Sequence, residues 1–255
     1  MASRQDLVDR LVAAVREGRA IAPLTDEVDL DIDEAYDVRD AVVAALDPDG
    51  GPRAAKLGLT SRAKQVQMSV DEPLYGWFLS GSQLDWGAPL VVDSLIQPRV
   101  EPEIGFLIGR ELGGPGVTAT QVLAATTAVM PGIDVLDSRF SGYAFTLSDV
   151  AADNSSAAKF VVGNPVPVGD TDLSLVGCVF EHNGDLVATA AGAAVLEHPA
   201  ASVAWLVRKL AERGEVLAAD TIVMAGALTQ AVAVAPGDHV RVTIDRIGSV
   251  ELRCE

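Results

Sequence analysis

Apolar positions recur with a helical period near the start of the chain. Residues 4–18 carry apolar side chains one turn apart, at Leu7, Leu11, Val12 and Val15. The same spacing returns over residues 31–46, where Asp31 is suited to cap the first turn. The glycine-rich stretch 47–53 follows as a turn or linker. The pattern predicts a helical N-terminal layer over residues 1–52.

Beyond this layer, short apolar runs alternate with Gly, Pro and Asp, which is typical of β-strands. The runs cover residues 89–96, 103–109, 158–163, 173–189, 221–229 and 237–253. An Asn-Gly pair within 182–185 indicates a β-hairpin. Helical spacing predicts helices over 119–129 and 199–213, the second ending at Gly214. The expected fold class is α+β, with residues 53–255 as one compact β-rich unit.

The composition fits a folded protein with a large core, since 49% of the 255 residues are hydrophobic. The formal net charge of −17 argues against nucleic acid or an anionic membrane as a partner, because both would repel this surface. Without a signal-peptide pattern or a membrane-spanning apolar run, we expect a soluble, cytoplasmic protein. Cys178 and Cys254 form no CxxC pair, which disfavours a zinc site or a disulfide scaffold.

Two carboxylates stand directly before an apolar run in the segment "QPRVEPEIGFLIG". Glu101 and Glu103 point to the same face if the segment is a strand. Their mutual repulsion near buried residues would be relieved by a divalent cation such as Mg²⁺, which binds one or two carboxylates. Pro102 cannot donate a ladder hydrogen bond, so the pair is expected at a sheet edge or a bulge. The alternative is an exposed strand face with two solvated glutamates.

Two further segments offer partners for such a site. "MPGIDVLDSRF" contains Asp134 and Asp137, and Asp134 is the polar exception in a short apolar stretch. Taken alone, it could equally belong to a turn or a cap. "DVAADNSSAAKF" gathers Asp153, Asn154, Ser155 and Ser156, which could line a pocket or simply cap a helix or turn.

Lys56 lies between alanine and leucine in "AAKLGLTS". A lysine in such surroundings can have a lowered pKa or hold an anion, although many such lysines reach the surface instead.

Seven motifs in this order resemble one known family. They are "AKLGLTS", "DEPLYG", "QPRVEPEIGF", "MPGIDVLDSRF", "DVAADNSSAAKFVVG", "AGAAVLEHP" and "GALTQAVAVAPGDHVRV". Over residues 35–250 the chain resembles the hydratase/decarboxylase branch of the fumarylacetoacetate hydrolase superfamily. The resemblance implies a β-rich roll that binds Mg²⁺ or Mn²⁺ through Glu101, Glu103 and Asp134. The family usually has glutamate at the third position, so Asp134 is shorter by one methylene.

Two activities compete within this branch. One is decarboxylation of 2-oxo-3-hexenedioate (4-oxalocrotonate) to 2-hydroxypenta-2,4-dienoate, and the other is hydration of that product. Hydratases of the branch tend to carry aspartate where this chain has Leu74, which favours the decarboxylase. Lys159 occupies a place where decarboxylases tend to have a basic residue, and it would suit the second carboxylate of the substrate. Glu197 stands where the family usually has glycine.

The resemblance also implies roles for individual residues. Lys56 would hydrogen-bond the substrate or move a proton, and Ser156 with Asn154 would orient substrate or water. Asp71 and Tyr75 are candidate catalytic residues on a segment that could close over the pocket. A bound metal would act as a Lewis acid during the loss of CO₂.

Other functions remain open at this point. Acylpyruvate hydrolysis is disfavoured because hydrolases of the superfamily use an N-terminal-side histidine, and this chain has none before His182. A non-catalytic subunit that supports a homologous hydratase is a further alternative. The expected partners are a small 2-oxo dicarboxylate, further copies of the chain and such a hydratase.

Overall fold

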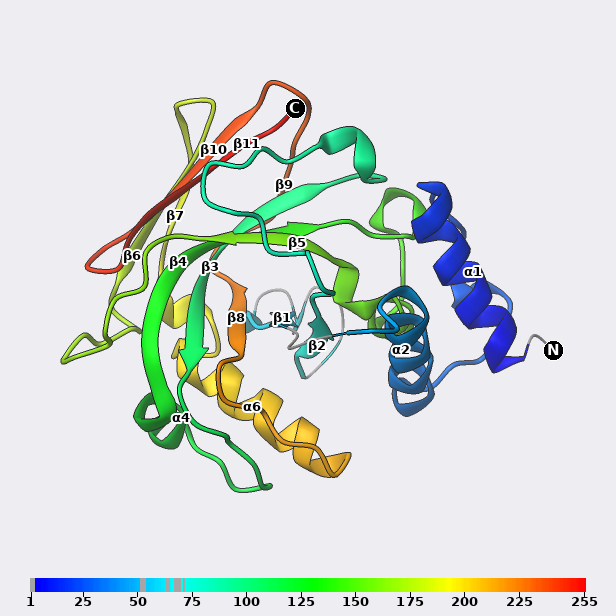
Figure 1. The fold of residues 1–255 in the computed structure, drawn as a ribbon, viewed down its shortest axis with the longest axis horizontal. Coiled ribbons are helices and arrows are strands. Elements are labelled where there is room, and N and C mark those ends of the chain that lie inside the picture. Colours follow the sequence, from blue (N-terminus) through cyan, green and yellow to red (C-terminus); the bar gives the residue numbers. More distant parts are fainter. Residues whose placement is uncertain (1–2, 51–53, 63–64, 67–69, 71) are drawn as a thin grey trace.

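A computed structural model describes residues 3–50, 54–62, 65–66, 70 and 72–255. Its centre is a strongly curved, mixed sheet of seven strands (Figure 1). In spatial order these are β2 (Leu74–Trp77), β1 (Ala55–Gly58), β8 (Ile222–Ala227), β3 (Arg99–Ile108), β4 (Thr126–Leu136) and β5 (Ala157–Val162), with β9 (Val232–Ala233) paired to β3. The observed mixture of helices and a dominant sheet confirms the α+β prediction.

The two longest strands, β3 and β4, run antiparallel through the middle of this sheet. Glu101 lies directly opposite Asp134 in their ladder. The register between β3 and β8 shifts between Glu103 and Gly105. The segment around Pro102 therefore lies in an interior strand next to a bulge. Of the two places expected for it, the bulge is correct and the sheet edge is not. Asp134 belongs to a strand, not to a turn or a cap.

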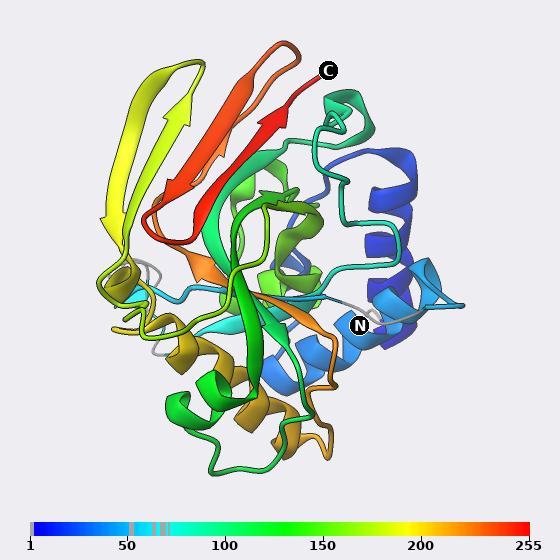
Figure 2. The same ribbon diagram turned by 60° about the vertical axis from the view of Figure 1, so that its left-hand side comes forward.

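A second, four-stranded antiparallel sheet packs beside the first (Figure 2). Its strands are β6 (Gly177–His182), β7 (Asp185–Ala191), β10 (His239–Ile244) and β11 (Gly248–Arg253). The predicted hairpin is confirmed between β6 and β7. Asn183 and Gly184 both have positive φ there, at 55° and 84°, which is the backbone of a tight I′ turn.

The described residues form five helices, which pack around the curved sheet and not over the four-stranded one (Figure 1). They are α1 (Arg4–Glu17), α2 (Ile32–Leu46), α4 (Ala119–Ala125), α5 (Leu147–Ala152) and α6 (Pro199–Glu212). Asp31 caps α2 as predicted, by accepting a hydrogen bond from the backbone of Glu34 over 2.8 Å. None of the described helices has the combination of length and apolar character needed to cross a membrane.

Two predicted elements differ from the structure. The helix expected over 119–129 ends at Ala125, because the β-branched residues that follow begin β4. The strand expected over 89–96 is irregular, with one bridge at Leu90 and a 3₁₀ turn over Val92–Ser94. Apolar content alone does not separate a strand from a buried loop.

The N-terminal helices pack on the body at several points. Asp149 of α5 accepts hydrogen bonds from the backbone N–H of Thr25 over 3.0 Å and from its hydroxyl over 2.6 Å. Arg39 of α2 lies against the stacked rings of Tyr36 and Tyr75 and is 1% exposed. The boundary at residue 52 between two units stays a prediction.

An unusual turn joins α5 to β5. Asn154, Ser155 and Ser156 all have positive φ, between 53° and 55°. A left-handed conformation costs an L-residue roughly 1–2 kcal/mol, so this turn needs support from its surroundings. Two glycines allow it to approach the sheet: a Cβ at Gly58 would lie 2.8 Å from the hydroxyl of Ser155, and one at Gly76 would collide with the carbonyl of Asn154.

We therefore expect Gly76→Ala to lower the free energy of unfolding by about 1–3 kcal/mol, because a side chain there displaces the turn. Gly116→Ala is the matched control, since a Cβ at Gly116 meets nothing within 4 Å. Urea unfolding monitored by circular dichroism measures both. Equal effects of the two substitutions would contradict the close approach of the turn to β2.

Candidate active site

Three carboxylates meet on one face of the central sheet. Glu101 and Glu103 are alternate residues of β3, and Asp134 lies opposite Glu101 on β4. Oxygen atoms of all three lie within 4.8 Å of one another, and all three residues are buried. Because Asp134 is paired directly with Glu101 across the two strands, it reaches the group although its side chain is one methylene shorter than that of glutamate. The alternative of two solvated glutamates does not apply.

The electrostatics of this cluster favour a cation. Burial, the charge of Asp134 and the charge of Glu101, in that order, raise the pKa of Glu103 well above its ordinary value. Its Oε2 accepts a hydrogen bond from the N–H of Gly226 over 2.8 Å. Its Oε1 is buried and has no hydrogen-bond partner among the described residues. Carboxylate oxygens are the ligands that hard divalent cations prefer, so these three residues fit a metal site.

Lys56 lies against the cluster instead of reaching the surface. It is 1% exposed, and its Nζ is 2.6 Å from Oδ2 of Asp134. β1 pairs with β8 and β8 with β3, so that Lys56, Met224 and Gly105 form one row across the sheet. The lysine charge offsets part of the repulsion among the carboxylates and so opposes part of the rise in the pKa of Glu103. A buried ammonium beside a metal-binding group is suited to donate a hydrogen bond or a proton to a substrate.

A cavity of about 370 Å³, which we call the inner cavity, adjoins this cluster. Of these groups, Lys56 and Glu101 line it, together with Arg99, Leu74, Ser155 and Ser156. The left-handed turn presents both serines to this space. A charged end and a wall that combines apolar side chains with a few polar groups suit a small anionic substrate.

The structure does not bring every predicted residue to the inner cavity. The amide of Asn154 is used by the backbone of Trp77: its Oδ1 accepts the N–H over 2.8 Å, and its Nδ2 donates to the carbonyl over 2.7 Å. Both polar ends of this amide are engaged in holding the turn to β2, and the substrate-binding role of Asn154 stays a prediction. Asp137 is also structural, since it accepts backbone hydrogen bonds from Ile96 and Gln97.

Tyr75 and Lys159 point away from the cluster. Tyr75 pairs with Leu57 and so lies on the face opposite Lys56, where its hydroxyl accepts a hydrogen bond from Arg39 over 3.2 Å. Lys159 pairs with Val135, next to Asp134, and therefore leaves from the other face. Its amine donates to the carbonyl of Gly81 over 3.0 Å. The structure therefore does not bring Tyr75 or Lys159 to the carboxylate cluster, and Asp71 lies outside the described residues.

Residues of the inner cavity that the motifs did not single out include Arg99, Leu59 and Tyr143. A signal for Arg99 was present, because it precedes Glu101 by two residues and so shares its face of β3. Nothing in the sequence indicated Tyr143, which comes from a turn far along the chain.

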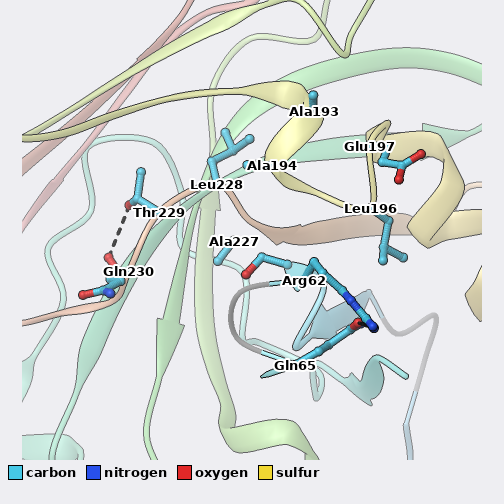
Figure 3. Close-up of a pocket in the computed structure, with 11 residues that line it drawn as sticks. Arg62, Gln65, Ala193, Ala194, Leu196, Glu197, Ala227, Leu228, Thr229 and Gln230 are labelled. Atoms are coloured by element: carbon cyan, nitrogen blue, oxygen red, sulfur yellow. Dashed lines mark hydrogen bonds between the residues drawn. The ribbon is translucent and has the colours of Figure 1, made fainter. Parts of the chain in front are cut away.

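A larger cavity of about 740 Å³, the outer cavity, adjoins the inner one, because Gln230 lines both. Figure 3 shows Gln230 among the residues that line the outer cavity. Arg62, Glu197 and Leu228 also line it. Glu197 has a φ of 66°, a left-handed conformation that favours glycine. This conformation gives a physical reason for the glycine usual in the family at a position where this chain has glutamate.

Residues 54–254 match the family described as "Fumarylacetoacetate (FAA) hydrolase C-terminal". The chain belongs to this family. A relative named 4-oxalocrotonate decarboxylase, from Pseudomonas sp. (strain CF600), is 42% identical over 89% of this chain and 87% of its own length. A relative named 2-keto-4-pentenoate hydratase, from Paraburkholderia xenovorans (strain LB400), is 36% identical over 99% of this chain and 95% of its own length.

A solved family structure agrees with the fold over its whole length. It is 4-oxalocrotonate decarboxylase from Pseudomonas putida, complexed with magnesium and adipate, with a TM-score of 0.93 and 35% identity over 100% of this chain and 99% of that one. The predicted family and its fold type are confirmed. Since both groups of named relatives are lyases, this chain is an enzyme of the lyase class.

The raised pKa of Glu103 leads to a prediction for the metal-free protein. The folded state holds a proton on this residue that the unfolded chain releases above its ordinary pKa of 4.5. Stability therefore falls as the pH rises from 4.5 through the raised pKa. We expect Glu103→Gln to raise the melting temperature by roughly 2–4 °C for each kcal/mol recovered, with a gain that increases with pH.

Differential scanning calorimetry between pH 5 and 8, with chelator present, measures this gain. Adding Mg²⁺ should raise the melting temperature of the wild type and leave that of Glu103→Gln nearly unchanged. Glu111→Gln, at an exposed position, is the control and should behave as the wild type does. A destabilised Glu103→Gln at pH 8 would show that the ionised carboxylate is tolerated without a cation.

Proposed function

We propose that this enzyme decarboxylates 2-oxo-3-hexenedioate (4-oxalocrotonate) to 2-hydroxypenta-2,4-dienoate with a divalent metal, Mg²⁺ or Mn²⁺. The observation that carries this choice within the family is Leu74, an apolar side chain in the wall of the inner cavity. The resemblance implies aspartate at this position in hydratases, where it would serve as a proton-transfer group. A cavity without that carboxylate favours loss of CO₂ over addition of water. The relative at 42% identity supports the same choice.

The chemistry assigns a task to each group at the charged end of the cavity. Glu101, Glu103 and Asp134 would hold the cation, which supplies Lewis-acid polarisation of a 2-oxo acid when bound. As the bond to the leaving carboxylate breaks, its electron pair moves through the C3–C4 double bond to the oxygen on C2. Lys56 donates a hydrogen bond and then a proton at this oxygen, which leaves the enol product.

The remaining residues orient the substrate. Ser155 and Ser156 line the inner cavity, and their hydroxyls would hydrogen-bond the first carboxylate. Their left-handed turn is braced by Asn154 on β2, so their directions are set by the sheet. Leu74 excludes water beside the reacting carbons, which limits hydration of the product.

Hydration of 2-hydroxypenta-2,4-dienoate is the second candidate, supported by the hydratase relative that covers 99% of this chain. The buried carboxylates and Lys56 serve either reaction, because both need the 2-oxo acid polarised. A scaffold subunit without activity would have no need of this cluster. Self-association, a complex with a homologous hydratase and a cytoplasmic location stay predictions.

The deciding assay compares 2-oxo-3-hexenedioate and 2-hydroxypenta-2,4-dienoate side by side with Mg²⁺. We expect CO₂ release from the first, followed by the ultraviolet absorbance of the dienoate, and little conversion of the second. Rapid hydration of the dienoate without action on the dicarboxylate would assign the hydratase instead.

Metal removal should abolish turnover of the dicarboxylate, because the carboxylate cluster alone repels an anionic substrate. Dialysis against EDTA followed by Mg²⁺ or Mn²⁺ tests this, with restored activity as the expected result. Glu103→Ala should stay folded and lose metal binding, measured by titration calorimetry. Full activity of the metal-free enzyme would exclude the proposed role of the cluster.

Replacing Lys56 by methionine should lower kcat by roughly 10²–10⁴-fold, the usual contribution of a positioned proton donor. Lys159→Met is the control, since Lys159 points away from the cavity, and it should retain kcat within about threefold. Steady-state kinetics in saturating Mg²⁺ measures both variants. Similar losses in the two would contradict the placement of Lys56 beside the reacting oxygen.

A further inference from the structure

Arg99 is a cation of the inner cavity that has no part in the proposed reaction. It is half-buried at the start of β3 and lines the cavity together with Lys56 and Glu101. Its guanidinium carbon lies over the ring of Tyr143, 4.0 Å from the ring centroid. The hydroxyl of Tyr143 donates to the carbonyl of Gln97 over 3.2 Å, which fixes the ring that supports Arg99.

The polar edge of this guanidinium has no partner among the described residues. The side chain of Arg99 makes no hydrogen bond and no ion pair with any of them, although the protein carries 36 acidic residues. Lys56, the other cation of the inner cavity among the described residues, is already paired with Asp134. A half-buried arginine that keeps its five donors free towards a cavity can bind a carboxylate through two parallel hydrogen bonds.

The position of Arg99 sets the length of the ligand. Arg99, Glu101 and Glu103 are alternate residues on one face of β3, so neighbouring Cα atoms in this row are roughly 6.6–6.8 Å apart. The terminal carbons of an extended six-carbon dicarboxylate are about 6 Å apart, from five bonds of about 1.5 Å. A ligand with one carboxylate at the carboxylate–lysine end can thus reach the guanidinium with the other.

Two other cations are poorly placed for this task. Lys159 leaves from the opposite face of the sheet and donates to the carbonyl of Gly81. Arg62 lines the outer cavity, and its guanidinium lies 3.5 Å from the side-chain oxygen of Gln65. Arg99 is better placed than either, because it lies on the same face of β3 as Glu101, within reach of a six-carbon ligand, and has no described partner for its guanidinium.

We propose that Arg99 binds the second, outer carboxylate of the substrate and so selects dicarboxylates over monocarboxylates. This inference rests on the proposed function for the identity of the substrate. In decarboxylation the bound carboxylate is the group that leaves, so its charge is lost as the reaction proceeds. An interaction made in the ground state and weakened in the transition state lowers KM without raising kcat. Arg99 is thus a specificity residue whose loss affects KM.

Binding of adipate and hexanoate by titration calorimetry in saturating Mg²⁺ tests the proposal, because the two differ only in the second carboxylate. The wild type should bind adipate at least 10-fold more tightly than hexanoate. Arg99→Leu should bring this ratio to about one and leave the affinities for hexanoate and Mg²⁺ unchanged. Arg99→Lys should keep part of the preference, since it retains the charge but loses the two parallel hydrogen bonds.

Arg110→Leu, an exposed arginine just beyond the other end of the same strand, is the matched control and should keep the full ratio. With 2-oxo-3-hexenedioate, Arg99→Leu should raise KM at least 10-fold without lowering kcat. An unchanged adipate-to-hexanoate ratio in Arg99→Leu would overturn the proposal, as would a wild type without any preference. An equal loss of affinity for hexanoate would do the same, because it would indicate a structural role.

Different results would contradict the role of Arg99 and the proposed reaction. If the wild type decarboxylates the dicarboxylate and Arg99→Leu keeps the preference for adipate, only the role of Arg99 is wrong. If the wild type prefers adipate through Arg99 but releases no CO₂, the carboxylate-binding role is supported and only the proposed reaction is wrong.

Discussion

The burial of three carboxylates within 4.8 Å of one another is the constraint on which the site depends. Like charges in a desolvated place cannot all remain ionised without compensation. Lys56 supplies one positive charge at 2.6 Å from Asp134, and Gly226 supplies one backbone N–H to Glu103. The three carboxylates together form a set of oxygen ligands that suits a divalent cation. A chain would not keep such an arrangement in its interior for stability, since apolar side chains fill the same space at lower cost.

The surrounding fold holds these groups in place through backbone geometry. The ladder between β3 and β4 sets Asp134 opposite Glu101, and the bulge against β8 turns the N–H of Gly226 towards Glu103. The left-handed turn at Asn154 brings two serines to the cavity, and it is accommodated because Gly58 and Gly76 have no side chains there. Strain of this kind is retained at functional sites when neighbouring contacts hold it.

The two ends of the inner cavity have different chemistry, and the difference explains how related enzymes can share a site. The carboxylates and Lys56 form an end that serves any 2-oxo acid, which fits both names found among the relatives. Leu74 and Arg99 line the remainder of the cavity. Under the proposed function, the first keeps water from the reacting carbons and the second recognises an outer carboxylate. Small changes at these two positions would redirect the reaction without altering the metal-binding end.

The sequence by itself determined the elements with strong periodicity and the residues that form local pairs. The capped helices, the Asn-Gly hairpin and the shared face of Glu101 and Glu103 follow from short-range spacing. The end of the helix at Ala125 was not predictable in this way, because its next residues join a strand that needs β3 as partner. The sequence also did not show on which face of the sheet Tyr75 and Lys159 lie, because that depends on strand register. Only the tertiary structure decided that Asp134 and Lys56 meet the glutamates and that Arg99 faces the same cavity, because contacts between distant segments depend on pairing across the sheet.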